Sequence, residues 1–310
     1  MNSFDTDALL AHCRTLAPAR TAIVHAVTAN VLQAAQEAQQ QGLITPVLVG
    51  PAARTREAAE AASVDISGWQ LIDAEHSHDA AAKAVALAAA REVDALMKGS
   101  LHSDELMGAV VKSDGGLRTE RRISHAFLMD LENYPKAFII TDAAVNIAPD
   151  LPTKADIVQN AVELWHALFG VAGLPKVAVL AAVETINPKM AATLDAAALC
   201  KMADRGQITG CLIDGPLALD NAISAEAART KGIVSPVAGD ADILLVPDIE
   251  AGNMLAKQLI FMSGAEAAGI VLGARVPVIL TSRADSQRAR LLSCAVALLL
   301  ADARSKGQIK

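Results

Sequence analysis

The segment Thr281-Ser282-Arg283 places two hydroxyls and a guanidinium between an apolar run and an expected helix over 285–303. The first amides of a helix lack partners, and the helix dipole places about half a positive charge there. A serine and an arginine at this point can bind an anion or the oxyanion that forms during acyl transfer. Capping of the helix would explain Asp285, but it does not require Arg283.

A second polar segment, Lys98-Gly99-Ser100-Leu101-His102, follows an expected strand over residues 94–97. Small residues after a strand can offer backbone N–H groups to an anion. Lys98 and His102 add charge and hydrogen-bond donors. An ordinary strand-to-helix connection remains the alternative.

A third segment carries three arginines within five positions, Arg118, Arg121 and Arg122, and Ser124 follows them. Guanidinium groups match phosphate oxygens in pairs, so the segment is a candidate phosphate clamp. A solvated charged turn explains the same composition.

A fourth segment begins where an expected strand ends at Val246 and a helix starts near Glu250. Asn253 and Lys257 are four residues apart and therefore share a helix face. Gly252 costs a helix about 1 kcal/mol relative to alanine, which indicates packing or a close approach at this point. A helix start without a functional role remains the alternative.

Composition excludes several classes of protein. Hydrophobic residues make up 53% of the 310 residues and charged residues 20%, a globular composition. Aromatics are only 3% and the net charge is -7, which disfavours nucleic-acid binding. The four cysteines form no CxxC pair, no signal peptide is evident, and the apolar stretch 291–301 is too short for a membrane span. We expect a cytoplasmic protein without a nucleic-acid or membrane partner.

Short apolar runs alternate with longer amphipathic or Ala-rich segments along most of the chain, which predicts an α/β fold with mainly parallel sheets. We expect a helix from about Arg20 to Gln41 and another over 153–169 with Thr153 as its N-cap. The stretch 291–301 belongs to a buried final helix. No GxGxxG, GxxxxGK[ST], HExxH or GxSxG motif is present, so dinucleotide, P-loop and zinc-hydrolase chemistry lack support.

Several long stretches closely resemble the phosphate acetyltransferase and phosphate butyryltransferase family, over about residues 20–303. They are KMADRGQITGCLIDGPLALDNAIS, VAGDADILLVPDIEAGNMLAKQL and VPVILTSRADS. GGLRTERRISHAFLMD, TDAAVNIAPDL and VAVLAAVETINPKM are similar to the butyryltransferase-like branch.

The resemblance implies a two-domain fold like that of isocitrate and isopropylmalate dehydrogenases, an active cleft between the domains and a homodimer. We place the first domain at residues 1–130 together with 273–310, and the second at 131–272. The implied reaction moves a short acyl group, from acetyl to butyryl, between phosphate and coenzyme A. It needs no metal and no cofactor beyond the substrate coenzyme A.

The resemblance also assigns roles to residues around the Ser-Arg pair. Ser282 would bind the acyl carbonyl oxygen and Arg283 the phosphate, with Asp285 as a third catalytic candidate. An aspartate that the acetyltransferase branch uses to deprotonate coenzyme A is replaced by Ala289 here. From the polar segments themselves, the candidate phosphate contacts are Lys98, Gly99, Ser100, His102, Arg121, Arg122 and Ser124. Arg121 and Arg122 fall near a phosphate-binding arginine of the family, and either of the two can correspond to it. The candidate coenzyme A or cleft contacts are Asn253, Lys257 and Thr281.

Two alternatives remain at this point. A metal- and NAD-dependent decarboxylating dehydrogenase of similar fold would need clustered aspartates, for which Asp240, Asp242 and Asp248 are the nearby candidates. A non-catalytic protein that binds acyl-coenzyme A is the other, because of Ala289. The resemblance slightly favours acyl chains of the butyryl class.

Overall fold

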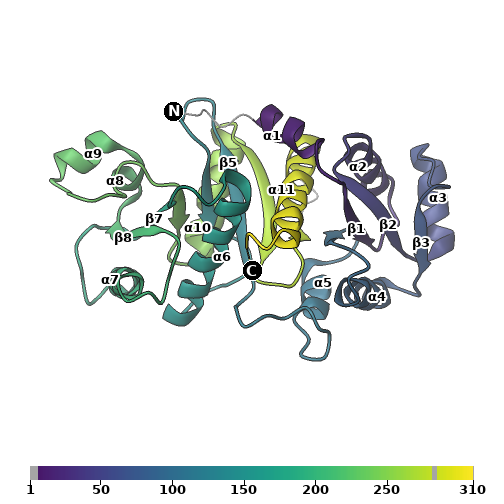
Figure 1. Ribbon diagram of the computed structural model, residues 1–310, viewed down its shortest axis with the longest axis horizontal. Helices are drawn as coiled ribbons and strands as arrows, with labels where there is room; N and C mark the ends of the chain where they lie inside the picture. Colours follow the sequence, from purple (N-terminus) through teal and green to yellow (C-terminus); the bar gives the residue numbers. More distant parts are fainter. Residues whose placement is uncertain (1–5, 281–284, 310) are drawn as a thin grey trace. The chain divides into compact units, whose positions relative to one another are not determined.

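The computed structural model describes residues 6–280 and 285–309, and its contacts divide the chain into two compact units (Figure 1). The terminal unit contains Asp5–Arg121 and Ala268–Gly307. The central unit contains Arg122–Ala267. The domain limits at 130 and 272 stay a prediction from the sequence.

The terminal unit is built on a sheet with the strand order β3-β2-β1-β4-β11-β10. All neighbours pair in parallel except β10 and β11, which are antiparallel. The strands are β1 (Ala19–Val24), β2 (Ile44–Gly50), β3 (Gln70–Asp73), β4 (Ala95–Lys98), β10 (Glu266–Leu272) and β11 (Val278–Ile279). The helices are α1 (Thr6–Cys13), α2 (Ala29–Gln40), α3 (Ala52–Ala62), α4 (Ser77–Ala89), α5 (Ser103–Val110) and α11 (Gln287–Ser305).

The central unit has the strand order β5-β6-β9-β7-β8, parallel except for the antiparallel pair β5 and β6. Its strands are β5 (Ser124–Asp130), β6 (Phe138–Thr141), β7 (Lys176–Leu180), β8 (Leu212–Leu217) and β9 (Ile243–Leu245). Its helices are α6 (Leu151–Phe169), α7 (Ala191–Asp204), α8 (Leu219–Ile223), α9 (Ala225–Thr230) and α10 (Ile249–Met262). Figure 1 shows α7, α8 and α9 around β7 and β8.

The α/β prediction is confirmed, but the helix expected from Arg20 to Gln41 is wrong in its first part. Residues Ala19–Val24 form strand β1, and α2 starts only at Ala29. The run Thr21–Val24 is fully buried between β2 and β4, where β-branched side chains pack well. A strand buried on both faces lacks the alternating pattern by which a strand is identified in a sequence.

The start of α6 also differs from the prediction. Asp150, rather than Thr153, is the N-cap, and its carboxylate accepts a hydrogen bond of 3.0 Å from the Thr153 N–H. A carboxylate is a preferred group at this position because it satisfies an unpartnered amide and interacts favourably with the helix dipole.

Each unit has its own apolar core. In the terminal unit the run Leu291–Leu300 of α11 is buried throughout, as the sequence predicts for the final helix. In the central unit Met129, Phe138, Ile140 and Leu244 form part of one buried cluster. Within residues 6–280 and 285–309, no helix has the length and apolar character that a membrane span requires.

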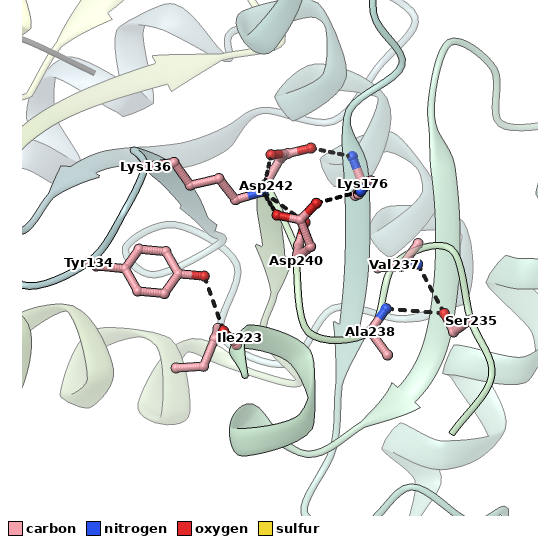
Figure 2. Close-up of polar contacts among 9 residues, drawn as sticks. All are labelled: Tyr134, Lys136, Lys176, Ile223, Ser235, Val237, Ala238, Asp240 and Asp242. Atoms are coloured by element: carbon pink, nitrogen blue, oxygen red, sulfur yellow. Dashed lines mark hydrogen bonds and ion pairs between the residues drawn. The ribbon is translucent and has the colours of Figure 1, made fainter. Parts of the chain in front are cut away.

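An ion-pair network joins the amino ends of β6, β7 and β9 (Figure 2). The Lys136 Nζ atom lies 2.7 Å from Asp240 Oδ1 and 2.6 Å from Asp242 Oδ1. Asp240 also pairs with Lys176, whose backbone N–H donates to Asp242 Oδ2 at 2.8 Å. Burial alone would raise the pKa of Asp240, but the hydrogen bonds and charges of the two lysines outweigh it and lower that pKa.

We expect Lys136→Met to lower the free energy of unfolding by about 1–3 kcal/mol at pH 7, because it removes hydrogen bonds to the half-buried Asp242. Since the pKa of Asp240 is lowered on folding, its contribution is complete above about pH 4 and is lost as the pH falls through the lowered value. Urea denaturation at pH 7 and below pH 4 measures both effects.

The matched control is Lys201→Met, which breaks the exposed pair with Asp204 in the same unit. This substitution should lower the free energy of unfolding by less than about 1 kcal/mol. The account of the network would be contradicted if both variants lost the same free energy of unfolding. It would also be contradicted if the decrease caused by Lys136→Met were larger below pH 4 than at pH 7.

Candidate active site

Three parallel strands of the terminal unit end at the same edge of its sheet. Val24 of β1 pairs with Lys98 of β4, and Ile279 of β11 pairs with Met97 of β4. The carboxyl ends of parallel strands are where open α/β sheets place their ligands. The segment after β4 therefore lies at such an edge. The predicted residues Thr281, Ser282 and Arg283 follow Leu280 in the sequence and lie outside the described residues.

The segment after β4 is held directly on β1. The Gly99 N–H donates to the Val24 carbonyl at 2.9 Å, and the Ser100 N–H donates to the His25 carbonyl at 3.0 Å. A Cβ at position 99 would lie 2.4 Å from the Val24 oxygen, so only glycine fits here. The sequence predicted that the backbone amides of Gly99 and Ser100 could bind an anion. In the structure both amides instead bind β1 and its extension and so fix the loop.

His25 reinforces this attachment through its side chain. Its Nδ1 atom lies 2.7 Å from the Ser100 carbonyl oxygen, so the residue bonds to Ser100 through both backbone and ring. His25 has a φ of 59°, a region that costs a non-glycine residue of order 1–3 kcal/mol and that clusters at functional sites. Sequence reasoning missed His25 because β1 was assigned to a helix.

A chain of polar side chains extends from the loop to the start of α2. Thr28 Oγ1 donates to Asn30 Oδ1 at 2.7 Å and lies 2.6 Å from Ser100 Oγ. Because the single hydroxyl proton of Thr28 is directed at Asn30, Ser100 is the donor in the second bond. Lys98 Nζ donates to the Leu101 carbonyl at 3.3 Å, and His102 is the N-cap residue of α5.

Helix α11 begins just after the Ser282–Arg283 position. Ser286 is its N-cap, and the Ser286 hydroxyl accepts a 3.0 Å hydrogen bond from the Ala289 N–H. Asp285 is half-buried immediately before the cap. A hollow of about 470 Å³ lies beside this helix start, and its lining includes Asn30, Gln287 and Arg290.

In the central unit, the loop after β6 connects several predicted residues. The carboxylate of Asp142, only 2% exposed, accepts backbone hydrogen bonds from Ala144 at 2.9 Å and Val145 at 3.0 Å. The Asn253 Nδ2 atom donates to the Ala143 carbonyl at 3.1 Å, which attaches α10 to this loop. A Cβ at Gly252 would lie 3.0 Å from the Asp142 carbonyl oxygen, which confirms the predicted close approach.

The other predicted residues of this unit differ in exposure. Arg122 and Lys257 are exposed, whereas Ser124 is fully buried and its hydroxyl accepts a 2.9 Å hydrogen bond from Asn160. Hydrogen bonds from Thr153, with a further contribution from the charge of Arg122, lower the pKa of Asp150.

His125 stays neutral in this environment. Its complete burial lowers its pKa to about 4, and the opposing negative charge of Asp142 only limits that shift. A neutral imidazole beside the Asp142 loop adds no charge to the site at neutral pH.

The four cysteines are unsuited to act as nucleophiles. Burial raises the pKa of Cys13 and Cys294 to about 12, and that of Cys200 and Cys211 to about 11. A thiol becomes a nucleophile through its thiolate form, which is scarce at such values. The cysteines therefore give no support to a covalent acyl-cysteine intermediate.

The three aspartates that a metal-dependent dehydrogenase would need do not form one group. Asp240 and Asp242 lie at the amino end of β9 and bind the two lysines of Figure 2. Asp248 lies beyond the other end of β9 and caps α10 through a 2.9 Å hydrogen bond from the Ala251 N–H. Across the described part of the chain, no three His, Cys, Asp or Glu side chains are grouped so that they could hold a metal ion.

Comparison with known proteins identifies the family. The family model described as "Phosphate acetyl/butaryl transferase" matches residues 10–84 and 76–298. The chain belongs to this family. It is an enzyme of the phosphate acetyltransferase and phosphate butyryltransferase kind, which sets aside the dehydrogenase and the non-catalytic alternatives.

The relatives carry both names of the family. A phosphate acetyltransferase of Rhizobium meliloti is 57% identical over 98% of this chain and 95% of its own length. A phosphate butyryltransferase of Clostridium acetobutylicum is 42% identical over 91% of this chain and 93% of its own. Both matches extend over nearly the whole of each chain.

Solved structures agree on the fold. A branched-chain phosphotransacylase from Enterococcus faecalis V583 has a TM-score of 0.78 at 30% identity, covering 91% of this chain and 99% of that one. A 4-hydroxythreonine-4-phosphate dehydrogenase from Burkholderia phymatum has a TM-score of 0.52 at 14% identity, covering 92% of this chain and 98% of that one. The second likeness confirms only that the fold is shared with dehydrogenases.

We expect Gly99→Ala to reduce kcat/KM for acyl transfer by about 10- to 100-fold, since the new methyl group forces the loop away from β1. The added strain should lower the free energy of unfolding by about 1–3 kcal/mol. Steady-state kinetics together with urea denaturation test the two effects.

Gly108→Ala is the matched control in the adjacent helix α5. A Cβ at that position would meet no atom within 4 Å. It should leave kcat/KM unchanged and stabilise the helix by about 0.5–1 kcal/mol. Full activity in Gly99→Ala would show that the contact with Val24 does not position the loop.

Proposed function

We propose that this enzyme transfers a short acyl group between phosphate and coenzyme A, forming acyl phosphate and coenzyme A from acyl-coenzyme A and phosphate. The observation that carries the proposal is the 57% identity to a named phosphate acetyltransferase over 98% of the chain. The sheet edge formed by β1, β4 and β11 supports it, because Ser282 and Arg283 come three and four residues after the end of β11 in the sequence.

In the proposed mechanism, the coenzyme A thiolate attacks the carbonyl carbon of the acyl phosphate directly. A carbon–sulfur bond forms, the carbon–oxygen bond to phosphate breaks, and phosphate leaves with the electron pair. Ser282 stabilises the negative charge that develops on the carbonyl oxygen, and Arg283 binds the phosphate. The raised pKa values of the cysteines favour this direct route over an acyl-enzyme on a thiol.

The thiol proton needs an acceptor. A thiol with a pKa of roughly 8.5 is only a few per cent thiolate at neutral pH, so either a base or nearby positive charge is required. Ala289 cannot accept a proton, and its amide is bound by the Ser286 cap. We assign this role to Asp285, the half-buried carboxylate that precedes the helix.

The remaining contacts are proposed from the sequence. Lys98, His102, Arg121 and Arg122 serve the phosphate side directly. Gly99, Ser100 and Ser124, whose amides or hydroxyl are hydrogen-bonded within the protein, shape the segments that carry these charges. Thr281, Asn253 and Lys257 serve coenzyme A. No metal or further cofactor is required by this chemistry, and we propose a cytoplasmic location.

A thioester assay with acetyl, propionyl and butyryl phosphate plus coenzyme A tests the function. The names of the relatives include both acetyltransferase and butyryltransferase, so the proposal covers this whole range. Thioester formation with at least one of the three is expected. Absence of turnover with all three would contradict the proposed function.

Arg283→Ala should lower kcat/KM by about 100- to 1,000-fold in that assay, because the departing phosphate loses its bidentate partner. Circular dichroism should show an unchanged fold. Arg54→Ala, which removes an exposed arginine from α3, is the control and should retain full activity. Near-normal rates for Arg283→Ala would remove the central assignment.

We further propose that the enzyme is a homodimer in which the outer face of α10 contributes to the interface. Met254, Phe261 and Met262 are 66%, 68% and 80% exposed, and their spacing of seven and eight residues places them on one helix face. An apolar stripe of this kind on a surface helix is typical of a protein–protein contact.

Phe261→Glu should shift the molecular mass in solution from twice the 32.1 kDa of the chain toward a single chain. The reason is that a buried unpaired carboxylate would destabilise the interface. Light scattering at several protein concentrations measures the shift. Val234→Glu changes another exposed apolar residue and should leave the mass unaltered.

A further inference from the structure

We infer that Asn146, Asp156 and Asn160 are positioning residues. They hold the backbone of Arg122 and Ile123 and the hydroxyl of Ser124, and thereby orient the adjacent arginine pair, Arg121 and Arg122, toward phosphate. We call these three side chains the arginine-segment clamp. The inference rests on the proposed function, because it assigns a task to the arginines of that site.

Two clamp residues lie on one face of α6. Asp156 Oδ2 accepts a 2.9 Å hydrogen bond from the Arg122 N–H. Asn160, four residues later, donates from Nδ2 to the Arg122 carbonyl at 2.9 Å and to Ser124 Oγ at 2.9 Å. Both backbone groups of Arg122 are therefore bound by side chains of the same helix.

The third clamp residue comes from the loop after β6. Asn146 Nδ2 donates to the Ile123 carbonyl at 2.8 Å and to Asp142 Oδ2 at 2.6 Å. The buried Asp142 carboxylate fixes the orientation of this amide, which leaves its second proton directed at Ile123. Each of the two asparagine amides thus uses both of its donor protons.

The pairing of β5 with β6 shows where the clamp acts. The paired positions of β5 with β6 extend from Ala126 to Met129. Residues 122–124 precede those positions, and the clamp supplies partners for the Arg122 N–H, for the Arg122 and Ile123 carbonyls and for the Ser124 hydroxyl. Asparagine has a low helix propensity, and Asn160 is only 3% exposed in the middle of α6, so its hydrogen bonds explain its presence there.

Fixing this backbone lowers the conformational entropy that the arginines lose when they bind an anion. Arginine side chains are rich in rotamers, and fixing the backbone beneath them reduces the freedom that remains to be lost when an anion binds. Arg122 is exposed while its backbone is tied at both ends. The clamp therefore acts through the arginines and makes no contact with phosphate itself.

Asn160→Asp provides the main test, since the carboxylate keeps the shape of the amide but cannot donate to Arg122 or Ser124. The KM for phosphate in the acyl-phosphate-forming direction should rise about tenfold, with kcat changed less than about threefold. Asp156→Ala should act in the same direction. Asp156→Asn retains an acceptor oxygen for the Arg122 N–H and should restore a nearly normal KM.

Gln159→Glu is the matched control on the same helix. Gln159 exchanges hydrogen bonds with the backbone of Thr209, at 3.1 and 3.0 Å, and contacts no part of the arginine segment. It should leave the phosphate KM unchanged, although it also removes a donor from α6. If Gln159→Glu raised the phosphate KM as much as Asn160→Asp, the effect of Asn160→Asp would reflect general destabilisation of the protein, and the inference would fail.

Double variants test whether the clamp works through the arginines. In a background of Arg121→Ala or Arg122→Ala, whichever weakens phosphate binding, Asn160→Asp should have little additional effect on the phosphate KM. A full additional tenfold rise in both backgrounds would overturn the inference.

Phosphate binding measured by titration calorimetry separates this inference from the proposed function. A protein that binds inorganic phosphate, with Kd values that follow the pattern above, supports the clamp even if it transfers no acyl group. A missing acyl transfer would then contradict only the function. A chain that shows no phosphate binding would overturn both.

Discussion

The terminal unit depends on one close approach, that of Gly99 to the Val24 carbonyl of the neighbouring strand. A parallel sheet aligns the ends of β1 and β4, but alignment alone leaves the following loops free to diverge. The amides of Gly99 and Ser100 prevent this by continuing the hydrogen bonding past the last strand residue. The positive φ of His25 is the conformational cost of presenting its carbonyl and its ring to the same loop.

The central unit uses side chains for the same purpose. The Asp142 carboxylate accepts hydrogen bonds from the backbone amides of the loop after β6. Asn146 of the same loop donates to the Ile123 carbonyl and so attaches the loop to the start of β5. Gly252 and Asn253 bring the start of α10 against the same loop. Ser124 and Asn253, predicted from distant segments, therefore belong to one hydrogen-bonded framework.

The sequence predicted those features that depend on local chemistry. The alternation of strands and helices, the buried final helix and the close approach at Gly252 are confirmed. The strand at Ala19–Val24 was hidden because its burial on both faces removes the alternating pattern that identifies a strand. His25, Asn146 and Asn160 were missed because the partners in these hydrogen bonds are between 23 and 75 residues away in the chain, and a single sequence does not reveal such pairs. The one available signal was an asparagine within the apolar periodicity of α6.

Charge explains why this degree of order is needed. The chain carries a net charge of -7, so its overall field repels the anions that it is proposed to bind. Long-range attraction cannot concentrate phosphate or coenzyme A at the site, and recognition must come from donors at hydrogen-bond distance. Such contacts stabilise a ligand only when their geometry is set beforehand, because each flexible arginine otherwise loses entropy on binding. The tied backbone beneath Arg122 and the loop fixed on β1 meet this requirement by the same physical means, in two units with unrelated local sequences.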